Sequence, residues 1–240
     1  MRVLSVITLI FTIIIAVALI VFFAFEKTIP TDWAKQAIID STANLKVADF
    51  DTLSTQDKLG CRKLVTEYSY SDTGIKVAVS RMATKVELVG TGENMIVRKK
   101  ITEYDLLSKP TSDISTYYYN KGGVPYKFEN ETQTEIKVSD WRNAIVSAMR
   151  EAFPVNSDGE FMFAELAQNI ESVSQIGVFV SGHAKDGDNT LDLVFDFMNR
   201  QLKEIKYTTF TTADGKAVSS TVTEYQIQFP TKIDLPEAIQ

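Results

Sequence analysis

The sequence begins with an apolar stretch that constrains every later interpretation. Residues 3–25 contain no charged side chain, and only Ser5, Thr8 and Thr12 place a hydroxyl group within the run. A bilayer core of roughly 30 Å requires about 20 helical residues, so this stretch is long enough to span it. A helix of a soluble protein keeps a polar face, which this stretch lacks. The pattern therefore predicts an N-terminal transmembrane helix.

The length of the run favours an anchor that stays on the protein. The apolar core of a cleaved signal peptide is typically about 7–15 residues long and ends at a small-x-small site. Here the single Ala-x-Ala sequence, residues 16–18, lies inside the run, and bulky phenylalanines follow it at positions 22, 23 and 25. These features indicate a signal-anchor.

The charges that flank the run predict its orientation. Arg2 and the α-amino group precede it, whereas Glu26 and Lys27 follow it and cancel. Because positive charge is retained on the cytoplasmic side, the N-terminus is expected in the cytoplasm. We therefore expect residues 1–27 to form a cytoplasmic stub and membrane anchor. Residues 28–240 would form an extracytoplasmic domain of a single-pass membrane protein.

Composition excludes several classes of partner and cofactor. The chain carries 25 Lys and Arg against 31 Asp and Glu, which gives a net charge of −6. A net-acidic chain is a poor ligand for nucleic acid, because phosphate contacts depend on clustered cations. With one Cys and one His, the chain can form neither an intrachain disulfide nor a structural zinc site. We expect no metal, no other cofactor and no nucleic-acid partner.

The remaining sequence has the pattern of one α+β domain. Helical patterns begin near Thr31, over residues 139–153 and, more briefly, over 160–169. Runs rich in Val, Ile, Thr and Tyr, separated by turn residues, predict strands. These runs are 62–70, 75–82, 84–91, 94–106, 113–120, 174–184, 190–198, 202–212 and 217–229. The order of elements predicts a large antiparallel sheet partly covered by helices.

Several motifs resemble those of the lipoprotein-carrier (LolA/LppX-like) superfamily. Tyr117–Gly123 followed by Tyr126-Lys127 is similar to an aromatic strand, glycine turn and Tyr-Lys hairpin of that family. Leu191–Asp196 with Leu202–Ile205 resembles its late paired strands, and Ile233–Pro236 resembles its closing Ile-x-Leu-Pro. The resemblance implies a curved half-barrel whose concave face, lidded by helices, holds acyl chains. The chain departs from the family in having a helical anchor in place of a lipidated cysteine or a cleaved signal.

The resemblance implies an extracytoplasmic module, anchored through residues 3–25, that binds a lipid or another hydrophobic ligand between sheet and helices. The candidate ligand-binding residues are Trp141, Leu193, Phe195, Tyr207, Tyr225 and Ile227. Trp33 and Trp141 occupy equivalent places in two helices (Thr-Asp-Trp and Ser-Asp-Trp), and either could line a groove or pack in the core. The alternative function is a structural or protein-interaction component of a cell-envelope assembly without a small ligand; its protein partners are not defined by the sequence.

Catalysis is not expected. His183, the one histidine, has no Ser or Cys nucleophile close to it in sequence, and Cys61 has the pattern of a small residue that enters a strand. Asp192 and Asp196 share one face of a strand at a separation of about 13 Å, which is too wide for a glycosidase pair. We interpret these two aspartates as solvent-facing charges.

Overall fold

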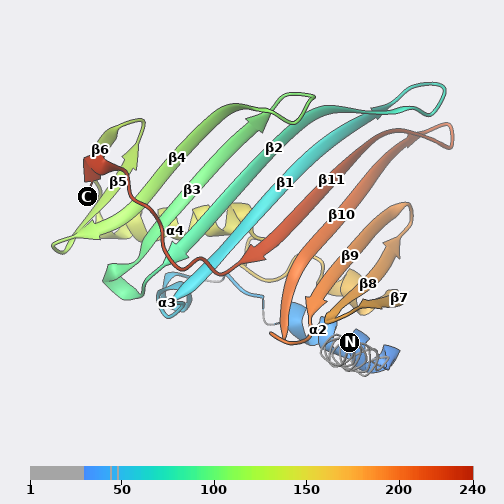
Figure 1. Cartoon of the computed structure of the whole chain (residues 1–240), viewed down its shortest axis with the longest axis horizontal. Coiled ribbons are helices and arrows are strands. Elements are labelled where there is room, and N and C mark those ends of the chain that lie inside the picture. The colour runs from blue at the N-terminus through green and yellow to red at the C-terminus, as the bar shows by residue number, and fades with distance from the viewer. Residues whose placement is uncertain (1–29, 44, 48, 240) are drawn as a thin grey trace, which may run out of the picture.

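The computed structural model describes residues 30–43, 45–47 and 49–239 (Figure 1). The predicted membrane segment 3–25 and the predicted stub and anchor 1–27 lie outside the described residues. Within the described part of the chain, no helix has both the length and the apolar character needed to cross a bilayer.

The described residues form short helices and long strands. The helices are α2 (Thr31–Ala43), α3 (Phe50–Ser54), α4 (Val138–Ala152) and α5 (Ala164–Gln168), with 3-10 turns η1 (Gly92–Asn94) and η2 (Glu237–Ile239). The first six strands are β1 (Lys58–Tyr70), β2 (Lys76–Val89), β3 (Ile96–Tyr104), β4 (Pro110–Lys121), β5 (Val124–Glu129) and β6 (Thr132–Glu135). The other five are β7 (Ile170–Ile176), β8 (Phe179–Asp186), β9 (Asn189–Asp196), β10 (Gln201–Ala213) and β11 (Lys216–Gln228).

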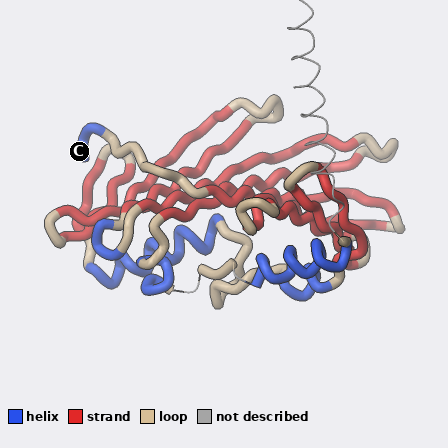
Figure 2. Tube along the Cα trace, turned by 60° about the horizontal axis from the view of Figure 1, so that its bottom comes forward, coloured by secondary structure: helices blue, strands red, loops and turns tan. Residues whose placement is uncertain are grey.

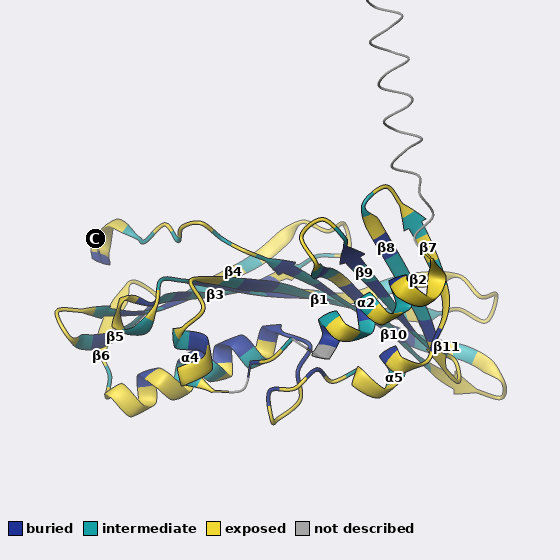
Figure 3. Ribbon diagram, turned by 90° about the horizontal axis from the view of Figure 1, so that it is seen from below, coloured by how far each residue is buried: buried dark blue, intermediate teal, exposed yellow. Residues whose placement is uncertain are grey.

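All eleven described strands belong to one antiparallel sheet with the order β6-β5-β4-β3-β2-β1-β11-β10-β9-β8-β7. The sheet is curved and does not close, since β6 and β7 remain its two edges. The helices cover one face, which we call the helix face (Figure 2). The C-terminal segment crosses the other face, which we call the tail face (Figure 3). This architecture confirms the predicted α+β class with a large curved antiparallel sheet partly covered by helices.

Some element boundaries differ from those predicted. The expected strands 75–82 and 84–91 are one continuous strand, β2, which contains a β-bulge opposite Glu67 and Tyr68. The expected strand 174–184 is instead the β7–β8 hairpin, which turns at Gly177 with φ 59°. A positive φ is accessible to glycine without steric cost, so Gly177 permits a turn that the β-branched composition around it hid.

The main core lies between the sheet and the helices. Its strand residues alternate along the chain, as Leu191, Leu193 and Phe195 do on β9, because successive side chains point to opposite faces. Ile145 and Met149 of α4 are fully buried against the same face, one helical turn apart. The core is continuous from α4 to α2, so the two helix groups and the sheet form one domain.

A second, smaller core lies on the tail face. Tyr117 and Tyr119 of β4 and Phe128 of β5 are buried there together with Ile239. Ile233 and Leu235 pack against the same cluster, so the C-terminal segment covers the sheet from outside (Figure 3). The closing Ile-x-Leu-Pro sequence therefore has a structural role in this chain.

A buried ion-pair cluster on the tail face should make stability depend on pH. Glu87 accepts hydrogen bonds from Lys85 at 2.8 Å and from Arg98 Nε at 2.8 Å, and its side chain is 8% exposed. Burial acts to raise the pKa of Glu87, but the hydrogen bonds from Lys85 and Arg98 outweigh it and lower the pKa below its usual value. The stabilisation is therefore complete above the ordinary glutamate pKa and is lost as pH falls through the lowered one.

We expect Glu87→Gln to reduce the free energy of unfolding by about 2 kcal/mol at pH 7, because it leaves two cations without a counter-charge. The difference from wild type should shrink as the pH falls through the lowered pKa of Glu87, because the carboxyl group then becomes neutral in the wild type as well. Denaturation followed by circular dichroism at pH 7 and over a series of lower pH values measures it, with the exposed Glu93→Gln as the matched control. A difference that stayed constant with pH would contradict the assignment.

Candidate functional site

Helix α2 lies across the ends of β8, β9 and β10 (Figure 1). It approaches the sheet closely at Gly182, where an added Cβ would lie 3.0 Å from the Cδ1 atoms of Ile38 and Ile170. Lys35 fixes the helix further by donating a hydrogen bond to the Ile170 carbonyl at 3.0 Å. The glycine in β8 therefore sets how near α2 lies to the sheet.

An apolar pocket opens between α2 and the end of β9. It has a volume of about 430 Å³ and is lined by Trp33, Gln36, Ala37, Asp40, Ser41, Phe195, Phe197 and Arg200. The Trp33 and Phe197 rings lie 4.6 Å apart, and Phe197 contacts Phe195 edge-on at 5.3 Å. Trp33 is nevertheless 56% exposed, an unusual position for so large an apolar ring. Trp33 and the half-buried Phe197 form an accessible aromatic surface, and the buried Phe195 packs against Phe197.

A second pocket of about 200 Å³ adjoins the first, since Ser41 and Arg200 line both. Its apolar lining residues are Leu45, Leu59, Phe153, Leu202, Ile227 and Phe229, and its polar ones are Ser41, Lys46, Gln56, Arg200 and Gln201. We call the two adjoining pockets the α2 groove. The groove thus combines apolar walls with several polar groups, a combination that suits small amphiphilic molecules.

The β9–β10 turn places Arg200 where the two pockets meet. Asp196, which is 5% exposed, accepts hydrogen bonds from the backbone N–H groups of Met198 at 3.0 Å and Asn199 at 3.1 Å. The Asn199 side chain donates a further bond at 2.7 Å, and this bond is the main cause of the lowered pKa of Asp196. The interpretation of Asp196 as a solvent-facing charge was therefore wrong, because its carboxylate is buried and accepts hydrogen bonds from the groups of the turn. Arg200 follows with φ 52°.

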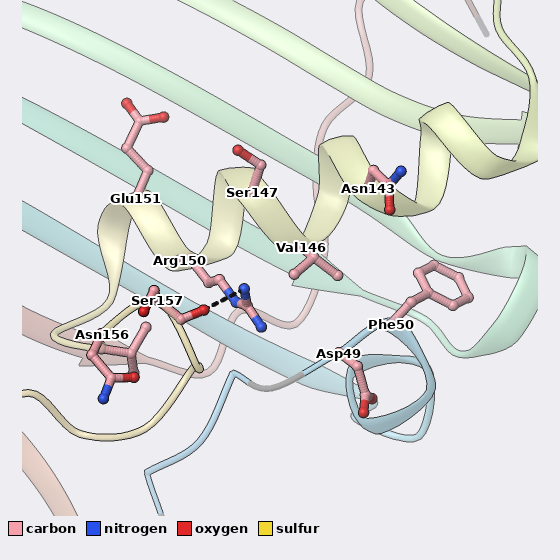
Figure 4. Close-up of a pocket in the computed structure, with 10 residues that line it drawn as sticks. Asp49, Phe50, Asn143, Val146, Ser147, Arg150, Glu151, Asn156 and Ser157 are labelled. Carbon is pink, nitrogen blue, oxygen red and sulfur yellow. Dashed lines mark hydrogen bonds between the residues drawn. The ribbon is translucent and has the colours of Figure 1, made fainter.

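A larger but more polar cleft lies on the outer side of α4 (Figure 4). It measures about 750 Å³ and is lined by Asp49, Phe50, Asn143, Val146, Ser147, Arg150, Glu151, Val155, Asn156 and Ser157. Arg150 donates hydrogen bonds to the carbonyls of Val47 at 3.0 Å and Ser157 at 2.7 Å. These bonds tie α4 to the neighbouring loops, so we assign the cleft a structural role.

The described residues offer little for catalysis or metal binding. No group of three or more His, Cys, Asp and Glu side chains that could hold a metal occurs among them. Burial raises the pKa of the Cys61 thiol to about 12, which keeps it protonated and unreactive at neutral pH. His183 Nδ1 lies 2.6 Å from Asp192 Oδ1 on the neighbouring strand, and both side chains are partly exposed to solvent.

The six candidate ligand-binding residues do not gather around one cavity. Trp141, Leu193, Phe195, Tyr225 and Ile227 are all buried in the main core, and of these Phe195 and Ile227 also line the α2 groove. Burial also raises the pKa of the Tyr225 hydroxyl to about 12. Tyr207 is half-buried and packs on Phe163 with ring centres 4.6 Å apart. Contact of these six residues with a ligand stays a prediction.

Most residues of the groove, Phe197 and Arg200 among them, were not among the six candidates. Trp33 was predicted either to line a groove or to pack in the core, and it lines the groove. Phe197 continues the alternation of Leu191, Leu193 and Phe195, which was the available signal for it. Arg200 was visible only as part of a turn, because nothing local in the sequence shows which helix packs beside that turn.

The comparisons with known proteins give a distant likeness in fold. No family model and no curated protein matches the chain. The crystal structure of LprF from Mycobacterium bovis aligns with a TM-score of 0.39 and 8% identity, covering 87% of this chain and 98% of that one. A β-barrel-like protein of domain of unknown function DUF1849 from Brucella abortus aligns with a TM-score of 0.18 and 6% identity, covering 72% and 98%. Both likenesses are too distant to assign a family or a ligand to this chain.

Proposed function

We propose that this protein binds a lipid or a similar amphiphile in the α2 groove and holds it beside a membrane. The observation that carries the proposal is the exposed Trp33 ring in contact with the half-buried Phe197, on a surface that leads past Arg200 into a pocket walled by Leu202, Ile227 and Phe229. Exposed apolar surface of this kind gains about 25 cal/mol for each Å² that an acyl chain covers. The proposed role is binding, and no catalytic step is part of it.

The proposed membrane anchor would bring the groove close to a lipid source. Residues 3–25 are proposed to span the bilayer, with the N-terminus in the cytoplasm and residues 28–240 outside. Only residues 26–30 separate the apolar run from α2, and five fully extended residues reach at most about 18 Å. Trp33 and the groove would then lie within about two nanometres of the membrane surface.

The proposal is tested by crosslinking in membranes that contain the full-length protein. A photoactivatable, alkyne-tagged alkyl lipid is supplied, irradiated and mapped by mass spectrometry of peptides. We expect labels in α2 and in the segments 195–202 and 227–229, as well as in residues 3–25. Ala37→Trp should fill the pocket between α2 and the end of β9 and reduce labelling of the α2 groove about ten-fold. Asp32→Trp, at an exposed position of the same helix, should leave the labelling unchanged.

Melting temperatures of both tryptophan variants confirm that they remain folded. Labels confined to residues 3–25, or groove labels that Ala37→Trp leaves unchanged, would refute ligand binding in the α2 groove.

A second candidate function is supported by exposed apolar residues at the ends of the long strands that lie away from the α2 groove. The β1–β2, β3–β4 and β10–β11 hairpins all turn at the same end of the strands (Figure 1). Their exposed apolar residues are Ile75, Val77, Val79, Leu106, Leu107 and Val218. Asp105 fixes the most exposed of these turns by accepting hydrogen bonds from the N–H groups of Leu107 at 2.9 Å and Lys109 at 2.8 Å.

Exposed apolar residues on ordered turns are typical of protein-contact surfaces, which supports the envelope-assembly alternative. Chemical crosslinking of the full-length protein in its native membranes tests it. Crosslinked partners lost in a Leu106→Ser, Leu107→Ser double variant would support this role, and recovery of monomer alone would remove its basis.

A further inference from the structure

We propose that Arg200 makes the α2 groove selective for anionic amphiphiles, meaning a single alkyl chain that ends in a phosphate or carboxylate. The inference rests on the proposed function, and it specifies the chemical class of ligand. It follows from the position of one guanidinium group, from the absence of a partner for it, and from the charges around it.

The backbone of the β9–β10 turn holds Arg200 in a fixed place. Asp196 binds the two preceding N–H groups and the Asn199 side chain, so the turn is ordered on its N-terminal side. The φ of 52° at Arg200 lies in the left-handed region, which a long side chain rarely adopts without a compensating reason. The side chain lines both pockets at their junction.

The guanidinium group has no partner within the described part of the chain, where it makes neither a hydrogen bond nor an ion pair. The carboxylate four residues before it, Asp196, has both oxygens engaged by Met198 and Asn199. Asp40, across the larger pocket, accepts a hydrogen bond from Gln36 at 2.8 Å. Arg200 is therefore an uncommitted cation at the mouth of an apolar site.

The charges of the groove favour an anion. The smaller pocket is lined by Arg200 and Lys46, and no Asp or Glu among the described residues lines it. Lys46 Nζ lies 3.9 Å from Glu160 Oε1, so the charge of Lys46 is partly neutralised. The charge of Arg200 has no such counter-charge in the described part of the chain. A guanidinium group binds phosphate or carboxylate through two parallel N–H···O bonds, which makes Arg200 the recognition element for the head of the ligand. The alkyl chain would then lie on the aromatic surface of Phe197 and Trp33.

The test uses two photoactivatable probes with the same alkyl chain, an alkyl phosphate and the corresponding fatty alcohol. Each is titrated against the full-length protein in phosphatidylcholine nanodiscs, and groove labelling gives an apparent affinity. We expect the wild-type protein to prefer the alkyl phosphate by at least ten-fold. Arg200→Gly removes the cation and suits a positive φ. It should abolish this preference and leave the apparent affinity for the fatty alcohol unchanged.

Matched variants separate recognition from general electrostatics. Arg200→Lys should restore part of the preference. Lys206→Gln, which removes an exposed cation of β10 that lines neither pocket, should leave the preference within two-fold of wild type. Equal loss of preference in Lys206→Gln and Arg200→Gly would overturn specific recognition by Arg200.

The remaining outcomes distinguish the two proposals. Equal affinity of the wild-type protein for both probes would overturn the selectivity and leave ligand binding intact. Failure of both probes to label the groove would refute the proposed function itself. Competition by inorganic phosphate as strong as that by unlabelled alkyl phosphate would show a site for a free anion and overturn the amphiphile assignment.

Discussion

Replacing Leu193 by alanine should lower the free energy of unfolding by about 3 kcal/mol, with little effect on ligand labelling. Leu193 lies in the middle of β9, opposite Gly182 of β8 and Ile205 of β10, and its side chain is fully buried. Deleting a buried leucine side chain removes its transfer free energy and leaves a cavity, at a cost of about 2–5 kcal/mol. The close packing of α2 on this part of the sheet limits the relaxation that could reduce that cost.

Denaturation of the full-length protein in a fixed mild detergent measures this effect. Val194→Ala is the matched control, because Val194 is the next residue on the same strand, points to the tail face and is only half-buried. Its replacement should cost less than about 1 kcal/mol. The opposite pattern for Leu193→Ala, with stability unchanged and labelling of the groove lost, would show that Leu193 lines a ligand cavity and not the core.

The alternation in the sequence predicted which face of β9 is buried, but not what buries it. Leu191, Leu193 and Phe195 share one face in sequence and in structure. Only Phe195 reaches the α2 groove, because α2 lies over the β8–β10 ends where the strand leaves the sheet. The difference between core and groove depends on the position of a helix about 150 residues away, and periodicity within one strand carries no such information.

The two tryptophans show more directly that local sequence does not reveal the tertiary surroundings of a side chain. Trp33 and Trp141 follow similar tripeptides near the starts of two helices. Trp141 is 2% exposed and packs against Phe50 of α3, whereas Trp33 is 56% exposed and contacts a turn. Local sequence predicted a helix start in both cases and could not distinguish their surroundings, since those are set by tertiary contacts.

The tail face was the least predictable part of the fold. The closing Ile-x-Leu-Pro sequence was noticed as a motif, and the aromatic strand Tyr117–Tyr119 as a hairpin. Their mutual packing through Ile233, Leu235 and Ile239 joins segments that are more than 100 residues apart. Pairings at such separations follow from the final arrangement of the sheet and leave no periodic signal in either segment.

Replacing residues 1–25 by a cleavable signal peptide should convert the protein from a membrane-bound form to a released, soluble one. The apolar run supplies the proposed bilayer contact, and a charge-free stretch of this length is long enough to span the hydrocarbon core. The full-length protein should sediment with membranes and resist alkaline carbonate extraction, whereas the exchanged form should appear in the extracytoplasmic fraction. Retention of the exchanged form on membranes would instead assign binding to the folded domain, with the apolar hairpin turns as the first surface to mutate.

The orientation of the proposed anchor can be determined with a single engineered cysteine, because the natural one is buried and unreactive. Cys61 is fully buried and its pKa is raised to about 12, so a membrane-impermeant maleimide should not modify it in the folded protein. Asp72→Cys, in the exposed β1–β2 turn, should be modified on intact cells if residues 28–240 lie outside the cytoplasm. Modification only after the cells are lysed would place the domain, and with it the α2 groove and Arg200, on the cytoplasmic side of the membrane.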